Sequence, residues 1–307
     1  MNRQEQKENN VRHEGLFQAW RAGRYVDRSP LRPSPQPVES AIRWRSMSNE
    51  PFFLRDGDTY QPTPVSRGPW SPTSLHGRVV AGLLAHVIEQ RHGESDLLPA
   101  RFTVDMYRLP DLSAATVTVT PIREGRRIKV IDAEYHVNGV SMARATCMFL
   151  RQTQNPEGKV WSPPNWDAPK ADDITPPETG RGPMGGMWAT RPISGGFGEF
   201  TATKRLWMSE VRECVGGEAM TPFVRAALAA DFASPFANSG DQGLNWINSD
   251  ITLYLHRLPT TPWVGFEVRN HGETKGVAIG ECWLYDEEGP IGTSTVAALA
   301  QARMRNS

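Results

Sequence analysis

The sequence predicts an α+β protein of two similar halves, each an antiparallel sheet curled around one central helix. A ten-residue segment occurs twice, and each copy follows a helical stretch and precedes a run of strand-like segments. A parallel doubly wound sheet would instead need helices between its strands. With 307 residues, the chain is long enough for two domains that each bury a core.

The repeated segments are residues 101–110 and 250–259, which align without a gap and share a Thr, an Arg, a Leu and a Pro. Apolar residues fall at matched alternate positions, so both segments are predicted to be strands with one buried face and an equivalent register. Their first positions differ, because Arg101 stands where the second copy has Asp250. An acid in one copy and a base in the other suggest that only one copy keeps its chemistry.

Composition excludes several classes of protein. The formal net charge is +0, so no overall field favours nucleic acid or an anionic membrane. The longest apolar run, residues 79–88, is far shorter than the roughly 20 residues of a membrane span. Three cysteines lie far apart without a C-x-x-C spacing, which argues against disulfides or a metal site and favours a cytoplasmic location. No metal or cofactor is expected.

Proline-rich stretches divide the chain. Residues 1–48 carry mixed charge and then four prolines, without the apolar segment of a signal peptide, and are predicted to form a largely irregular arm. The first half spans 49–152 and the second 185–307. Residues 153–184 between them contain two Pro-Pro pairs and are predicted to be a linker.

The order of elements is predicted to be the same in both halves. The first half has a helix from residue 71 to about 89, closed by Gly93, and then strands over 102–109, 116–123 and 128–150, the last folded at Asn138-Gly139. In the second half, Thr221-Pro222 opens a helix to about residue 232. Its strands are predicted over 188–193, 205–211, 251–258, 263–269, 277–285 and 291–302.

A family resemblance rests on several segments in a fixed order. They are Leu75-His-Gly-Arg-Val-Val-Ala-Gly-Leu-Leu-Ala, residues 98–110, Ala229-Ala-Asp-Phe, residues 247–259, Trp263-Val-Gly and residues 285–294. Together they resemble the double hot-dog fold of bacterial type II acyl-CoA thioesterases, over roughly residues 50–303. The resemblance implies hydrolysis of a fatty acyl-CoA substrate. Hot-dog sheets of this family commonly associate edge to edge or back to back, so the resemblance is also compatible with a homo-oligomer.

The resemblance implies that an Asp, a Thr or Ser, and a Gln hold and activate a water. Asp250 matches the Asp, His271 falls at the hydroxyl position, and Ala297 falls at the Gln position, with Gln301 four residues further on. A carboxylate at residue 250 could accept a proton from the attacking water, and a neutral His271 could bind that water. The alternatives are a turn-capping Asp and a loop His, both in solvent.

The start of the first helix, His76-Gly77-Arg78, is the second candidate. Unpaired N–H groups and the positive dipole end suit a developing oxyanion at Gly77 and Arg78, and the resemblance implies the same use, with His76 beside the substrate. Alternatively, Gly77 only allows close packing. Asp231 matches a family position in the second helix and is either a substrate contact or a structural cap.

Two basic residues at a strand connection, Arg126 and Arg127, could contact the phosphates of CoA, although a solvated hairpin explains them as well. The leading hypothesis is therefore an acyl-CoA thioesterase. Because the Gln is missing and a His replaces the hydroxyl, a protein that binds acyl-CoA or another apolar ligand without hydrolysis is an alternative. A hot-dog enoyl-CoA hydratase, which needs a paired Asp and His near its substrate, is a third.

Overall fold

The computed structural model describes residues 50–162, 166–177 and 186–301. The predicted arm, residues 1–48, lies outside them. All the described residues belong to one compact unit. No helix among the described residues is long and apolar enough to cross a membrane.

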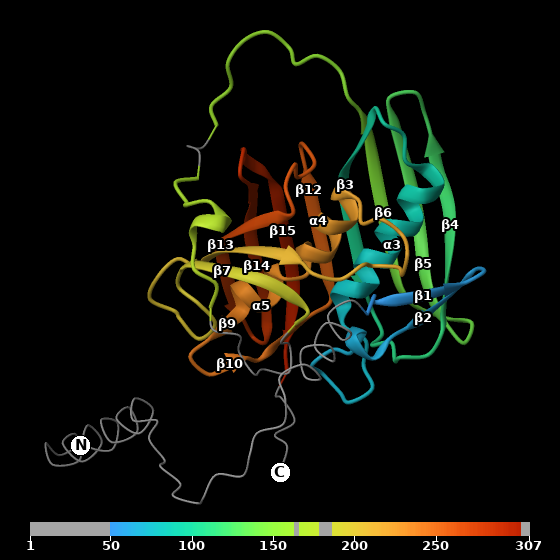
Figure 1. The fold of residues 1–307 in the computed structure, drawn as a ribbon, viewed down its shortest axis with the longest axis horizontal. Coiled ribbons are helices and arrows are strands. Elements are labelled where there is room, and N and C mark those ends of the chain that lie inside the picture. Colours follow the sequence, from blue (N-terminus) through green and yellow to red (C-terminus); the bar gives the residue numbers. More distant parts are fainter. Residues whose placement is uncertain (1–49, 163–165, 178–185, 302–307) are drawn as a thin grey trace, which may run out of the picture. The chain divides into compact units, whose positions relative to one another are not determined.

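Thirteen strands form one antiparallel sheet in the order β1-β2-β4-β5-β6-β3-β12-β15-β14-β13-β8-β7, with β11 also paired to β15 (Figure 1). The first half contributes β1 (Phe53–Asp56), β2 (Thr59–Pro62), β3 (Leu97–Met106), β4 (Ala115–Glu124), β5 (Ile128–Val137) and β6 (Val140–Arg151). The second half contributes β7 (Trp188–Ser194), β8 (Arg205–Glu210), β11 (Trp246–Asn248), β12 (Asp250–Leu255), β13 (Trp263–Thr274), β14 (Val277–Asp286) and β15 (Gly289–Ala300). Two short strands, β9 (Ser239–Gly240) and β10 (Gly243–Leu244), pair separately.

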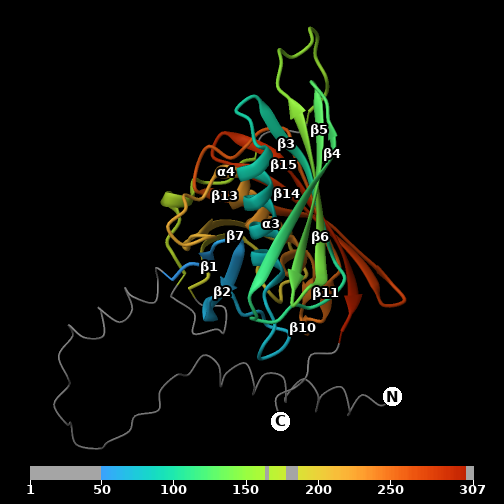
Figure 2. The same ribbon diagram turned by 90° about the vertical axis from the view of Figure 1, so that its right-hand side faces the viewer.

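Three α-helices cover one face of the sheet: α3 (Gly77–His92), α4 (Pro222–Ala230) and α5 (Ala233–Asn238). The predicted helix ends are largely confirmed, because Thr221 caps α4, Pro222 is its first residue and Gly93 is the C-cap of α3. The first helix begins at Gly77 rather than at residue 71, because Ser71 and Ser74 hydrogen-bond each other in a turn. Helix α3 contacts β3 to β6 (Figure 2). Helix α5 contacts β13 to β15.

The two copies of the repeat pair with each other. Strand β3 runs antiparallel to β12, and Thr103 stands directly opposite Thr252, its equivalent in the repeat. An approximate two-fold axis therefore passes between these threonines, whose Oγ1 atoms are 3.4 Å apart. The prediction of two separate sheets is corrected to one continuous sheet. The physical reason is that each repeat strand would otherwise be an edge strand with unpaired backbone groups.

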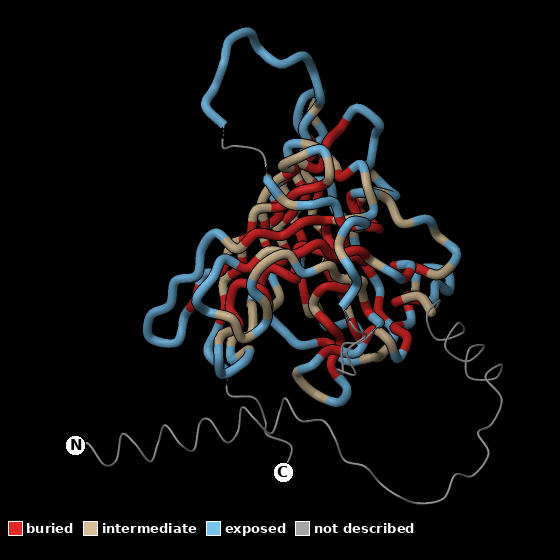
Figure 3. The backbone as a smooth tube through the Cα atoms, turned by 60° about the vertical axis from the view of Figure 1, so that its left-hand side comes forward, coloured by how far each residue is buried: buried red, intermediate tan, exposed pale blue. Residues whose placement is uncertain are grey.

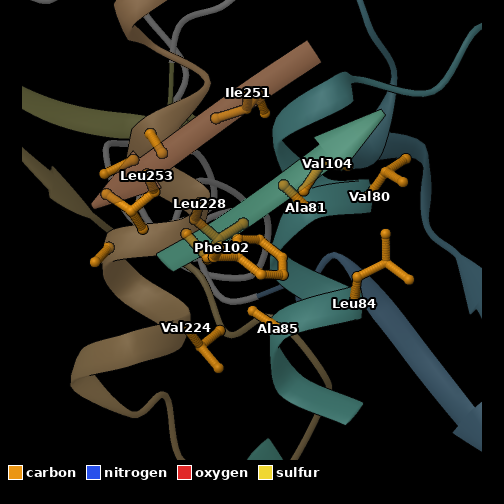
Figure 4. Close-up of a cluster of buried hydrophobic side chains, with 14 of the residues drawn as sticks. Val80, Ala81, Leu84, Ala85, Phe102, Val104, Val224, Leu228, Ile251 and Leu253 are labelled. Atoms are coloured by element: carbon orange, nitrogen blue, oxygen red, sulfur yellow. The ribbon is translucent and has the colours of Figure 1, made fainter. Parts of the chain in front are cut away.

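The core lies between the sheet and the helices, where Figure 3 shows most of the buried backbone. The predicted buried faces of the repeat are confirmed, since Phe102, Val104, Ile251 and Leu253 are all 0% exposed. These four side chains point towards α3 and α4 at the junction of the halves (Figure 4). The two halves consequently share one hydrophobic core.

The predicted hairpin at Asn138-Gly139 is confirmed between β5 and β6. Both residues have positive φ, 51° and 75°, as a two-residue type I′ turn requires. Part of the predicted linker packs on the second half, where Trp166 stacks on Tyr285 with ring centroids 4.4 Å apart.

Candidate active site

The N-terminus of α3 lies against a carboxylate of the second half. A Cβ on Gly77 would be 2.9 Å from Met106 Sδ and 3.4 Å from Asp231 Oδ1, so glycine permits this close approach. His76 is the N-cap, and its Nδ1 lies 3.4 Å from the backbone N of Arg78 and 3.5 Å from Asp231 Oδ2. Nδ1 cannot accept a hydrogen bond from the Arg78 N–H and also donate one to Asp231, so the tautomer of the His76 ring decides which of these two weak hydrogen bonds forms.

Asp231, the C-cap of α4, is 4% exposed. Asn248 Nδ2 donates to its Oδ1 at 2.8 Å and also lies 3.3 Å from the backbone oxygen of Asp250. Burial raises the pKa of Asp231, but His76, Asn248 and Arg78 outweigh it and hold that pKa below the ordinary value. Asp231 is therefore an ionised carboxylate that joins the N-terminus of α3 to the start of β12.

The side chain of Arg78 belongs to the core. It is 1% exposed, forms an ion pair with Glu210, and lies over the rings of Phe52 at 5.2 Å and Trp188 at 4.6 Å. Its backbone N–H, at the N-terminus of the helix, lies 3.4 Å from His76 Nδ1 and would exchange this weak contact for one to a ligand.

Asp250 begins β12 at a bulge. Asn248 pairs with Ala298, and Thr252 pairs with Thr295. The three residues between Asn248 and Thr252 therefore lie opposite only two residues of β15, as in a β-bulge. The backbone N–H of Ala297 donates to Asp250 Oδ1 at 2.6 Å, which fills the gap in the ladder. Burial raises the pKa of Asp250; Asp105, directly opposite on β3, adds to the rise, while the Ala297 N–H opposes it.

His271 does not join Asp250. It is exposed on β13, where its Nδ1 lies 2.8 Å from Asn238 Oδ1 and its Nε2 lies 3.2 Å from Glu273 Oε2. Two strands, β15 and β14, separate β12 from β13. Three strand spacings amount to about 14 Å, too far for both residues to bind one water directly.

Arg126 and Arg127 are exposed in the turn between β4 and β5, near the other end of α3. Their backbone oxygens accept hydrogen bonds from Arg151 Nε and from the backbone N of Arg151, respectively. This ties the turn to the end of β6, beside the loop that follows α3. The pair is therefore well separated from Asp250 and from the N-terminus of α3.

The sequence did not predict a cleft of about 590 Å³ at the C-terminal end of α3. Its polar lining includes Glu89, whose pKa burial raises while Thr221 opposes the rise, and His86, whose pKa burial lowers while Glu218 opposes the fall. The sequence feature that could have indicated this cleft is the presence of polar residues in an otherwise apolar helix. Among the described residues, no cluster of His, Cys, Asp and Glu could hold a metal ion.

Family models match most of the chain. Residues 66–150 match the acyl-CoA thioesterase N-terminal domain, and residues 163–299 match the acyl-CoA thioesterase C-terminal domain. No curated protein matches the sequence.

Three solved structures share the fold at low sequence identity. A hot-dog-fold protein of unknown function from Alicyclobacillus acidocaldarius has a TM-score of 0.65 and 17% identity, with 82% of this chain and 96% of that chain covered. A putative thioesterase II from Thermobifida fusca has a TM-score of 0.61 and 15% identity, covering 84% and 97%. The tesB protein of Mycobacterium avium subsp. paratuberculosis has a TM-score of 0.60 and 13% identity, covering 81% and 96%. The predicted family is thus confirmed, and the chain belongs to the acyl-CoA thioesterase family of thioester hydrolases.

Proposed function

We propose that this protein hydrolyses a fatty acyl-CoA to the free acid and CoA, with Asp250 as general base. The observation that carries the proposal is the state of this carboxylate, which is half-buried and has a raised pKa. Among the described residues only Ala297 donates a hydrogen bond to it, through Oδ1, so Oδ2 can receive a proton from water. A base with a pKa nearer the working pH transfers protons more effectively.

The chemical step needs only the carboxylate, water and N–H donors. Asp250 removes a proton as the water oxygen bonds to the thioester carbon, and the tetrahedral oxyanion is stabilised by the backbone N–H groups at Gly77 and Arg78. The C–S bond then breaks, and the thiolate takes the proton back from Asp250. The contacts from Asp250 through Asn248 and Asp231 to Gly77 support placing both ends of this reaction at one site.

This proposal uses the predicted residues unequally. His76 and Asp231 hold the N-terminus of α3, whereas Arg126 and Arg127, in the turn between β4 and β5, lie too far from this site to take part in the step. His271 has no part in the step because of its separation from Asp250. The two halves are interpreted as a double hot-dog, with α3 in the first half and the consecutive helices α4 and α5 in the second as the helices inside the curved sheet, which the hot-dog structural neighbour supports.

The test is Asp250→Asn, assayed by thiol release from decanoyl-CoA. Loss of a general base should lower kcat/KM on the order of 100-fold or more, while the circular dichroism spectrum stays unchanged. The matched control is Asp241→Asn, at an exposed position, which should keep full activity. Equal turnover of the wild type and Asp250→Asn would refute the assigned role.

The pH profile gives a second readout. Asp250 must be ionised to act, so kcat/KM should fall as the pH drops through its raised pKa. Asp105→Asn removes the opposing negative charge and should move this acidic limb to lower pH without abolishing activity. An unmoved limb would mean that another group controls it.

Two alternative functions keep specific support. Ala297 offers Asp250 only a backbone N–H where the family resemblance implies a glutamine side chain, which favours a protein that binds acyl-CoA without cleaving it. Tight binding by calorimetry without thiol release would establish that alternative. The contact between His76 and Asp231 supplies the paired His and Asp of a hydratase. Loss of enoyl-CoA absorbance in the ultraviolet would support it.

A cytoplasmic location and assembly of identical chains remain part of the proposal. Cys147, Cys214 and Cys282 are free and buried, which suits a reducing compartment. Native mass spectrometry would give the number of chains directly.

A further inference from the structure

The two-fold relation of the halves extends to the N-termini of their helices. Helices α3 and α4 pack together, and each N-cap residue contacts a carboxylate of the other helix segment. His76 Nδ1 lies 3.5 Å from Asp231 Oδ2, and Thr221 Oγ1 donates to Glu89 Oε2 at 2.5 Å. The molecule therefore contains two helix N-termini of similar construction, each beside a carboxylate.

The two helix N-termini differ in how accessible the neighbouring carboxylate is to solvent. At the N-terminus of α3, Asp231 is buried and is also held by Asn248. At the N-terminus of α4, Glu89 is only partly buried and lines the cleft of about 590 Å³, together with Thr221. A volume of this size is typical of a small-molecule site.

Three carboxylates line the cleft, and among the described residues Glu89 is the one that has no cationic partner. Glu94 is paired with Lys129 and Arg151. Glu218 is paired with Arg55 and lies 2.8 Å from His86 Nε2. Within the part of the chain that the structure describes, the carboxylate of Glu89 accepts a hydrogen bond only from Thr221 Oγ1.

The cleft has walls suited to a thioester and its pantetheine arm. Its lining combines apolar side chains with hydroxyl and amide groups, which suit the amides of such an arm. The apolar lining residues are Leu97, Leu98, Pro99, Phe149 and Leu258, and the polar ones include Gln90, Ser95, Gln152 and Thr221. Gln152 follows Arg151, whose hydrogen bonds hold the backbone of Arg126 and Arg127, so the turn that carries these two exposed arginines lies next to the cleft lining.

We propose that this cleft is a second acyl-CoA site, in which Glu89 is the general base and Arg126 and Arg127 contact the phosphates of CoA. The inference rests on the proposed function and adds a site in the half that carries Arg101 in place of Asp250. Glu89 takes a proton from water as the C–O bond forms, and returns it to the thiolate when the C–S bond breaks. The turnover that remains without Asp250 is assigned to this site.

Binding is tested independently of turnover with a non-hydrolysable thioether, S-decyl-CoA, by calorimetry. The wild type should bind two molecules per chain, and Ala219→Phe, which fills the cleft from an exposed lining position, should bind one. Ala114→Phe makes the same change at an exposed position outside the cleft lining and should still bind two. One molecule per chain in the wild type, or two in Ala219→Phe, would overturn the proposal.

The role of Glu89 is tested in the background of Asp250→Asn. Adding Glu89→Gln, which keeps an acceptor for Thr221, should lower the remaining thiol release at least tenfold. Adding Glu124→Gln, at an exposed position of the same half, should not change it. Unchanged release with Glu89→Gln would refute this role. Absence of thiol release from the wild type would instead refute the proposed function, and the binding stoichiometry would still decide the second site.

Discussion

Asp231 is a buried charge at the contact between the halves, and its removal should destabilise the protein. Its carboxylate accepts a hydrogen bond from Asn248 at 2.8 Å and faces His76 at 3.5 Å. A hydrogen bond to a charged group contributes about 1.5–3 kcal/mol. Asp231→Ala should therefore lower the free energy of unfolding by about 1.5–3 kcal/mol at neutral pH.

Asp231→Asn separates charge from shape, because it keeps an oxygen that can accept from Asn248. It should cost less than Asp231→Ala, and Asp241→Asn, at an exposed position, should cost within about 0.5 kcal/mol of zero. Urea denaturation followed by circular dichroism measures all three. An Asp231→Ala protein as stable as Asp241→Asn would refute the reasoning.

The same residue has a defined pH dependence. Its folded pKa lies below the unfolded value of 3.8, so its stabilisation is complete above pH 3.8 and is lost as the pH falls through the lower folded pKa. The stability difference between the wild type and Asp231→Asn should therefore shrink in that acidic range. A difference that stays constant there would contradict an ionised Asp231.

Two further predictions concern the core. Gly82→Ala should lower the free energy of unfolding by about 1–3 kcal/mol through overpacking, because the new Cβ would lie 2.6 Å from Leu228 Cγ. The control in the same urea titration is Gly196→Ala, where a new Cβ would have nothing within 4 Å. Equal stabilities of the two variants would contradict the close contact at Gly82. Burial raises the pKa of all three cysteine thiols, so they should resist a disulfide reagent in the native protein and all react in urea. Their low reactivity in the native protein would also keep the background of a thiol-release assay low. Rapid reaction of the native protein would be inconsistent with this burial.

Much of the local structure follows from the sequence. The alternation of apolar residues in the repeat predicts which faces of β3 and β12 are buried, and Thr221-Pro222 and Asn138-Gly139 predict a helix start and a turn. These features depend on residues that are neighbours in the chain, so a short window of sequence contains the required information. The order of such segments also carries the family resemblance.

The arrangement of the candidate sites was decided by tertiary structure. The pairing of Thr103 with Thr252, the burial of Arg78 against Glu210 and the contact of Glu89 with Thr221 join residues more than 130 positions apart. Arg78 could equally have been a surface cation, and Glu89 a solvated helix residue, from their local sequence. Backbone propensity and periodicity act over a few residues, whereas burial, charge pairing and pKa depend on which distant segments the packed core brings together. The sequence therefore determined the elements and the family, and only the fold determined which carboxylates are buried and which line a cleft.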